Sequence, residues 1–181
     1  MPIKPFPSID RGGAYYRVCK PDWIDFGDTE HSKTRGGRWN PAGEFGALNL
    51  NASLRVAAAQ ARHQHVGRAI GLFDLRPERR PSLAVFNVPL ISVVDVVNAA
   101  SLRVLGLPQR YPVDVAWEPC QRIARRVYPT GIAGIAARSH AEARVGHVVG
   151  EELAYFDSQV TLSIRKQQRF QEWYPDQHPT N

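Results

Sequence analysis

The stretch from residue 35 to residue 43, Arg-Gly-Gly-Arg-Trp-Asn-Pro-Ala-Gly, constrains the backbone more than any other part of this chain. Asn40-Pro41-Ala42-Gly43 has the composition of a β-turn, with proline at the second corner and glycine closing the turn. Gly36-Gly37 allows close approach of the backbone just before Arg38. The segment is either a basic turn on a solvated edge or a ligand clamp, in which Arg38 binds a phosphate or carboxylate beside the flat face of Trp39.

The composition predicts a single folded domain. The chain has 181 residues, 43% of them hydrophobic, which is enough for one sizeable core. No apolar run approaches the length of a membrane span and the first residues lack a signal-peptide core, so we expect a cytoplasmic protein. Cys19 and Cys120 are too few for a disulfide framework or a structural zinc site, and we predict two buried thiols. His63 and His65 point to different faces of a helix, so no metal site is expected.

The net charge of +6 favours anionic partners without choosing between a nucleic acid, a dinucleotide and an acidic protein. Arg35 and Arg38 flank the glycines, whereas residues 76–80 form a separate Arg- and Pro-rich segment that predicts a solvated hairpin or loop. The charge is not accompanied by a recognition helix, a zinc finger or a stacked-aromatic pattern. Direct binding of nucleic acid is therefore not expected.

Hydrophobic spacing predicts an α+β fold in which strands dominate. The predicted helices are 53–65 with Ser53 as N-cap, about 99–105 between Asn98 as cap and Gly106 as stop, and a run from Pro119 to Tyr128-Pro129. The predicted strands are 47–50, 69–75, 82–88, 131–138, 152–158 and 160–164. We expect one domain over residues 1–165 and a peripheral helix or tail over 166–181. Its Phe170, Trp173 and Tyr174 dock either on the same domain, which is the commoner outcome, or on a partner.

Segments in both halves of the chain, taken in order, resemble the RES domain family. The first half is similar to the family at Tyr16-Arg17-Val18, Gly36 to Gly43, Ala47 to Leu50 and Ala57-Ala58-Ala59-Gln60. The second half is similar at Val93 to Val96, Leu102 to Leu107, Trp117 to Gln121, Gly131 to His140 and Ala154 to Asp157. The similarity covers about residues 14–158, and only Gly-Gly-Arg-Trp-Asn is specific by itself.

The resemblance implies an ADP-ribosyltransferase-like core of small mixed or antiparallel sheets with short flanking helices. It implies an enzyme that consumes NAD by phosphorolysis or hydrolysis of the nicotinamide–ribose bond, or that transfers ADP-ribose to a protein. Such a protein is a bacterial toxin neutralised by an Xre-type antitoxin, with NAD as substrate and no cofactor. The sequence leaves the oligomeric state open, a homo-oligomer included.

Site residues are carried over from the family position by position. Arg17 and Arg38 match its two phosphate-binding arginines, and Ser139 matches a serine that could orient a ribose hydroxyl or the carboxamide. The residues expected in catalysis are Arg17, Arg38, Gln60 and Ser139. The residues expected to bind NAD are Tyr16, Arg17, Gly36, Gly37, Arg38, Trp39, Asn40, Asn49, Glu118 and Ser139.

Two positions depart from the family. Gln60 stands where the family has glutamate and Asn49 where it has tyrosine, which removes a negative charge and an aromatic ring. Glu118 either supplies the missing carboxylate or is an acid favoured by the dipole at a helix start. The alternative function is therefore a catalytically weakened module that binds NAD or a partner.

Overall fold

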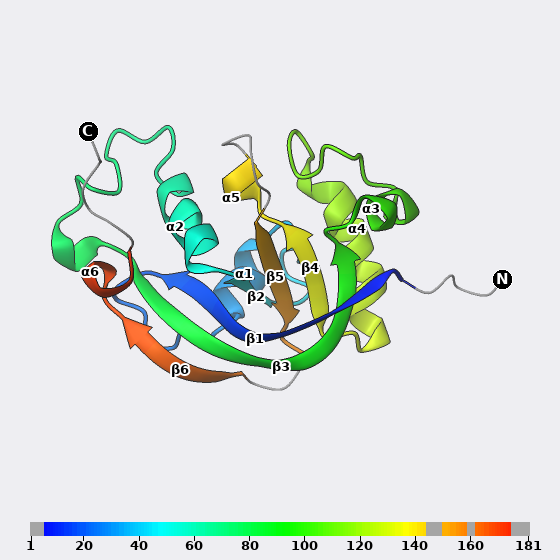
Figure 1. Cartoon of the computed structure of the whole chain (residues 1–181), viewed down its shortest axis with the longest axis horizontal. Helices are drawn as coiled ribbons and strands as arrows, with labels where there is room; N and C mark the ends of the chain where they lie inside the picture. Colours follow the sequence, from blue (N-terminus) through cyan, green and yellow to red (C-terminus); the bar gives the residue numbers. More distant parts are fainter. Residues whose placement is uncertain (1–5, 144–149, 159–161, 175–181) are drawn as a thin grey trace.

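The structure, a computed structural model, describes residues 6–143, 150–158 and 162–174, which form a six-stranded sheet with short helices around it (Figure 1). The strands are β1 (Ser8–Cys19), β2 (Ala47–Asn51), β3 (Ser82–Val96), β4 (Gly134–Arg138), β5 (Glu151–Phe156) and β6 (Ser163–Gln168). The helices are α1 (Glu30–Arg35), α2 (Leu54–His63), α3 (Ala99–Leu105), α4 (Trp117–Val127), α5 (His140–Ala143) and α6 (Phe170–Trp173), with 3-10 turns η1 (Pro77–Arg79) and η2 (Tyr128–Thr130). The predicted α+β fold with a mixed sheet is confirmed.

Pairing between β1 and β3 closes the sheet into a ring. The strand order is β1-β2-β5-β4-β3-β6, and the additional β1–β3 ladder runs from Ser8 opposite Val94 to Cys19 opposite Ser82. The β3–β4 pairing is parallel and the other pairings are antiparallel. In Figure 1 the long strands β1 and β3 curve beneath β2, β5 and β4, and α2 and α4 stand on either side.

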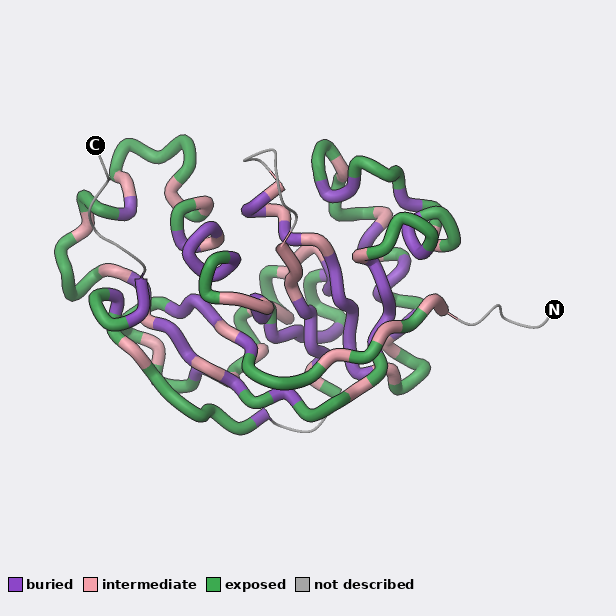
Figure 2. Tube along the Cα trace, viewed as in Figure 1, coloured by how far each residue is buried: buried purple, intermediate pink, exposed green. Residues whose placement is uncertain are grey.

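Three apolar clusters hold the elements together. The ring encloses the first, which includes Tyr15, Leu50, Phe86 and Leu153. The second packs α3 and α4 against the outside of β4 and β5, and the third packs α2 and α6 against β1 and β3. Figure 2 shows buried residues gathered along the central strands, and exposed residues along the peripheral loops and along β6. Both thiols are free and buried, as predicted.

β3 continues well past the predicted end at Val88 because a β-bulge accommodates its proline. Between two neighbouring paired positions, Pro89 and Leu90 of β3 stand opposite the single residue Gly12 of β1. Proline lacks an N–H group and is tolerated at a bulge. The opposing glycine is needed because a Cβ at Gly12 would lie 2.9 Å from the Cα of Leu90.

The strand predicted over residues 69–75 is wrong, because these residues form turns. Leu72 packs into the cluster beneath α2 and α6, and the ring of Phe73 lies 5.5 Å from that of Tyr174. The Phe73 ring therefore contacts the C-terminal aromatic residues, and residues 69–75 form no ladder with a strand of the described sheet. The strand predicted over 131–138 begins at Gly134, and of the strand predicted over 160–164, residues 160 and 161 lie outside the described residues.

The predicted helices are confirmed with small changes at their ends. Ser53 caps α2, its Oγ accepting from the Val56 N–H at 3.2 Å, and Gly106 ends α3 with a φ of 74°. α4 begins at Trp117, two residues before Pro119. In the described part of the chain, none of the helices has both the length and the apolar character needed to span a bilayer.

The segment after Arg165 docks on its own domain, but residues 166–168 belong to a strand of the sheet and not to the predicted peripheral helix or tail. Its first residues continue β6, which pairs with β3, and α6 follows. Phe170, Trp173 and Tyr174 are buried against Val18 and Leu83.

Candidate functional site

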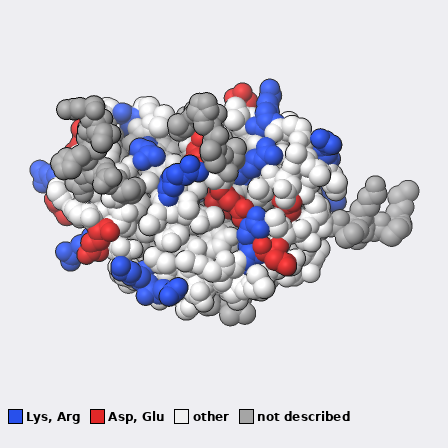
Figure 3. All heavy atoms as spheres, viewed as in Figure 1, with Lys and Arg blue, Asp and Glu red and all other residues white. Residues whose placement is uncertain are grey.

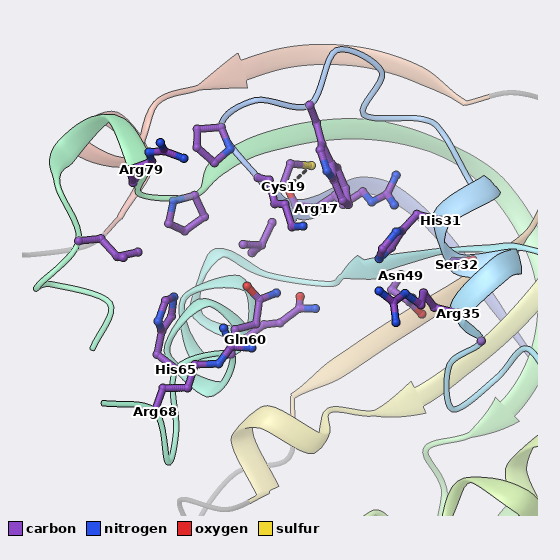
Figure 4. Close-up of a pocket in the computed structure, with 18 residues that line it drawn as sticks. Arg17, Cys19, His31, Ser32, Arg35, Asn49, Gln60, His65, Arg68 and Arg79 are labelled. Atoms are coloured by element: carbon purple, nitrogen blue, oxygen red, sulfur yellow. Dashed lines mark hydrogen bonds between the residues drawn. The ribbon is translucent and has the colours of Figure 1, made fainter. Parts of the chain in front are cut away.

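A cavity of about 470 Å³ lies beside the C-terminal end of β1 and is shown in Figure 4. Its walls come from the end of β1 and the residues after it, from α1, from β2 and α2, and from the loop between α2 and β3. Cavities of this size hold small-molecule ligands. Its lining includes four residues predicted for the site: Arg17, Gly36, Asn49 and Gln60.

The cavity is strongly basic. Its lining contains five cationic side chains and no aspartate or glutamate among the described residues; the five are Arg17, Lys20, Arg35, Arg68 and Arg79. None of the five forms an ion pair with a described carboxylate. Figure 4 shows Arg35 on one side of the cavity, Arg68 and Arg79 on the opposite side, and Arg17 between them. Such an arrangement attracts a ligand with more than one negative charge.

Acidic residues lie elsewhere on the surface. Asp22 and Glu78 border a neighbouring hollow that shares Lys20 and Arg79 with the cavity. Figure 3 shows lysine, arginine and acidic side chains interleaved over the face that it displays. The described lining of the cavity thus carries cations alone, whereas the face in Figure 3 carries both signs of charge.

Arg17 lies near the end of β1 and is buried. Its Nη1 donates to the carbonyl oxygens of Phe26 and Asp28, the latter at 3.0 Å, and its guanidinium carbon lies 5.0 Å from the centre of the Trp23 ring. Burial lowers the pKa of this guanidinium. The Nε and Nη2 atoms of Arg17 form no hydrogen bond with the described residues. This edge of the guanidinium group is therefore available to a ligand.

The glycine-rich segment forms a tight turn that is held from two sides. The Gly37 N–H donates to the Asn40 carbonyl at 2.7 Å, and the Gln121 amide of α4 donates to the Gly37 carbonyl at 2.8 Å. Gly36 has a φ of 71°, and a Cβ there would lie 2.8 Å from the backbone nitrogen of Ala42. Glycine is therefore required at position 36, which brings its backbone to the cavity wall.

The turn predicted over residues 40–43 lies one residue later. The Glu44 N–H donates to the Pro41 carbonyl at 3.4 Å, and Gly43 has a φ of 80° at the third position. Asn40 is fully buried, and its amide donates to the carbonyls of Ser32 at 2.8 Å and Phe45 at 3.3 Å. The Asn40 side chain therefore holds the segment together from inside.

Arg38 and Trp39 lie apart from the cavity. The Nη1 of Arg38 donates to the Val115 carbonyl at 2.8 Å, and its guanidinium carbon lies 5.9 Å from the centre of the Tyr111 ring. Trp39 is buried in the cluster beneath α3 and α4, its ring 6.0 Å from that of Tyr111. The structure thus brings Arg17 to the cavity, whereas the Arg38 side chain contacts Tyr111 and Val115, which precede α4.

Asn49 and Gln60 both line the cavity. The Gln60 Oε1 accepts a 2.6 Å hydrogen bond from Asn51, whose amide also donates to the Tyr16 carbonyl at 3.0 Å. Asn51 is only 1% exposed and was not predicted as a site residue. Its signal in the sequence is its spacing, because two residues along a strand share a face. The Tyr16 side chain packs half-buried near α2, and Tyr15 lies inside the ring.

Ser139 and Glu118 have separate surroundings. Ser139 is buried after β4, and its Oγ donates to the Glu152 Oε1 at 2.6 Å. Glu118 is exposed in the first turn of α4 and pairs with Arg122 at 2.5 Å. Glu118 thus stands as an acid at the start of a helix. Glu152, like Asn51, was not predicted as a site residue from the sequence.

Of the histidines that the structure describes, His63 and His140 are in contact with each other and His65 has a separate neighbour. The His63 ring packs edge-on against the His140 ring at 5.1 Å, and the His65 Nδ1 lies 3.3 Å from the Ile70 carbonyl oxygen. Within residues 6–143, 150–158 and 162–174, no group of three or more histidine, cysteine, aspartate or glutamate side chains is placed to hold a metal ion.

Comparison with known proteins gives a family and a fold. The crystal structure of the M. tuberculosis MbcT–MbcA toxin–antitoxin complex contains a similar fold, with a TM-score of 0.73 and 18% identity, covering 88% of this chain and 85% of that one. None of the curated proteins matches the chain. The RES domain model matches residues 14–173, from β1 to the last residue of α6. The chain therefore belongs to the RES domain family.

Proposed function

We propose that the chain binds NAD in the basic cavity and cleaves its nicotinamide–ribose bond. The observation that carries this proposal is the charge of the cavity, which has five cationic side chains and no acid among its described lining residues. A dinucleotide diphosphate is an anion that arginine forks bind well. Trp23 and His31, whose rings lie 6.2 Å apart at the same wall, offer aromatic faces to a base.

The reaction class comes from family membership and agrees with the polar groups of the cavity wall. Breaking the bond develops positive charge on the ribose carbon, so neutral or negative oxygen atoms are needed nearby. The side-chain amides of Asn49 and Gln60 line the cavity and carry such oxygens, although the Gln60 oxygen already accepts from Asn51. The acceptor of the ADP-ribosyl group is water, phosphate or a protein side chain.

We further propose that the chain is a bacterial toxin neutralised by an Xre-type antitoxin. The solved structure with the similar fold is of a toxin–antitoxin complex, which supports a protein partner of this kind. A second candidate, a module that binds NAD without degrading it, is favoured by the replacement of the family's glutamate and tyrosine with Gln60 and Asn49. Nicotinamide release by the purified protein separates the two functions.

Removing the exposed cations on the two sides of the cavity should weaken NAD binding. Arg35→Ala and Arg79→Ala each remove a charge-assisted contact of about 1.5–3 kcal/mol, so each should raise the Kd roughly tenfold or more. Both side chains are exposed, so folding should be retained. Calorimetry with NAD would measure the effect, with Arg122→Ala on the exposed face of α4 as the matched control. Unchanged affinity in both cavity variants would contradict the proposed site.

Expression in a bacterial host tests the toxin proposal. An active RES toxin should lower the cellular NAD pool and arrest growth, and co-expression with its antitoxin should restore both. Growth curves and enzymatic NAD assays on the same cultures would measure this. Growth arrest with a normal NAD pool would favour ADP-ribosylation of a protein.

A further inference from the structure

The outer face of the sheet carries a polar patch between its two apolar clusters. Asn49 and Asn51 of β2 share this face, and Asn51 is the direct cross-strand partner of Glu152 of β5. Directly opposed residues have Cβ atoms about 4.5–5.5 Å apart, and Asn49 is the diagonal neighbour of Glu152 at about 7–8 Å. Asn51 in turn binds Gln60. Asn51 alone therefore stands between Glu152 and Gln60. Gln60 occupies the position at which the family has its carboxylate.

The two adjacent glutamates of β5 face opposite ways. Glu151 forms a two-pronged ion pair with Arg11 of β1, with Nη2 donating to Oε2 at 2.7 Å. Glu152 has no such partner among the described residues, and its Oε1 accepts from the Ser139 Oγ. The residue is half-buried and lies outside the cavity lining, but its diagonal neighbour Asn49 lines the cavity, so the carboxylate stands directly behind that wall. Glu152 is thus a carboxylate on the outer face of the sheet, without an ion pair to the described residues.

We propose that Glu152 is the catalytic carboxylate of this chain and faces the reacting ribose carbon in place of Gln60. This inference rests on the proposed NAD-cleaving function. In the hydrolytic case the bond between the ribose carbon and the nicotinamide nitrogen breaks, and its electron pair leaves on the now neutral nicotinamide. The oxygen of a water molecule forms the new bond to that carbon, and the water proton passes to the Glu152 carboxylate and then to solvent. The products are ADP-ribose, nicotinamide and one proton.

A purely structural role for Glu152 is the competing explanation. Glu152 accepts hydrogen bonds from the Ser139 hydroxyl and the His140 backbone N–H, and both hold the start of α5. A structural role depends on the position of the carboxylate against these donors. A catalytic role depends on its position against the ribose, which a carboxylate at residue 60 could also reach. A double variant with glutamate at residue 60 and glutamine at residue 152 moves the carboxylate to the other side of Asn51. It therefore separates the two explanations.

The experiment measures nicotinamide release and NAD affinity for the wild type, Glu152→Gln, Gln60→Glu/Glu152→Gln and Glu151→Gln. We expect Glu152→Gln to lower kcat at least 100-fold with KM changed less than threefold, and the double variant to recover at least tenfold. Glu151→Gln, which removes a carboxylate from the opposite face of the same strand, should keep its kcat within twofold. If Glu152→Gln does not fold, Glu152→Asp replaces it, and its shortened carboxylate should lower kcat at least tenfold with affinity retained.

The possible failures are distinguishable. Turnover within threefold of wild type in Glu152→Gln, or no recovery in the double variant, would overturn the role of Glu152 and leave the proposed function standing. A wild type that binds NAD but releases no nicotinamide would overturn both the reaction and the catalytic carboxylate. A wild type that binds no NAD would remove the proposed function, and the role of Glu152 with it.

The pH profile gives a readout that a structural role would not change. Burial raises the pKa of the Glu152 carboxyl and Glu142 acts in the same direction, whereas the Ser139 hydroxyl and Arg38 act against it. The buried Tyr111 phenol also senses this carboxylate. Because the ionised form is needed, kcat/KM should fall on acidification at a pH above the usual glutamate range. This acid limb should disappear in Glu152→Gln.

Discussion

Replacing Phe170 with alanine is expected to lower the free energy of unfolding by about 3–5 kcal/mol, the usual cost of truncating a buried aromatic side chain. Phe170 is 2% exposed, stacks on Tyr174 at 4.6 Å and meets Trp173 edge-on at 5.8 Å. Urea unfolding followed by tryptophan fluorescence would measure the loss. Phe73→Ala, at a half-exposed aromatic of the same group, should cost distinctly less.

The Phe170 variant also tests whether the C-terminal segment supports the cavity. Phe73 lies in the loop between α2 and β3 that contributes His65, Arg68 and Arg79 to the cavity wall. Loosening the aromatic cluster should therefore weaken NAD binding at temperatures where the variant is still folded. A loss of stability below about 1 kcal/mol would show that α6 is only loosely attached, because buried aromatic truncations cost several times more.

Arg17→Ala is expected to weaken NAD binding at least tenfold and to destabilise the fold as well. The lost phosphate contact is worth about 1.5–3 kcal/mol, and of the two carbonyls left without this donor the buried one of Phe26 costs about 1–3 kcal/mol. These carbonyls belong to Phe26 and Asp28. Calorimetry on the folded variant and urea unfolding would measure the two effects separately.

Arg17→Lys is the matched variant, because lysine keeps the charge without the planar fork. It should recover part of the NAD affinity but little of the stability that the two carbonyl contacts provide. Wild-type affinity in a folded Arg17→Ala protein would remove Arg17 from the proposed NAD site and leave only its role in holding the loop.

Elements with local signals were predictable from the sequence. The helix at 54–63 has a serine cap and regularly spaced alanines, and the helix at 99–105 ends at a glycine that adopts the left-handed conformation. The turns at 69–75 were mistaken for a strand because their apolar residues pack against Phe170 and Tyr174, far away in the sequence. The continuation of β3 beyond Val88 was missed because the bulge that tolerates Pro89 depends on Gly12 of another strand.

In the candidate site, too, residues with a signal in the sequence could be predicted, whereas residues placed by long-range packing could not. Arg17, Asn49 and Gln60 could be placed by family resemblance, and the structure brings them to one cavity. Glu152 could not be found in this way, because the face it occupies depends on its register with Asn51. The roles of Asn40 and Trp39 could not be read either, since only the packing of the chain shows that their side chains point inward.

The closed ring of strands has a consequence for how the chain reaches its native state. Cys19 pairs with Ser82 and Ser8 with Val94, so β1 must wait for a strand that is synthesised much later. Bringing such distant segments together costs loop-closure entropy and slows folding. During this interval the open edge of β1 can pair with the same edge of another chain, which is the usual route to aggregation. Refolding yield should therefore fall as protein concentration rises, while the completed ring leaves this edge covered.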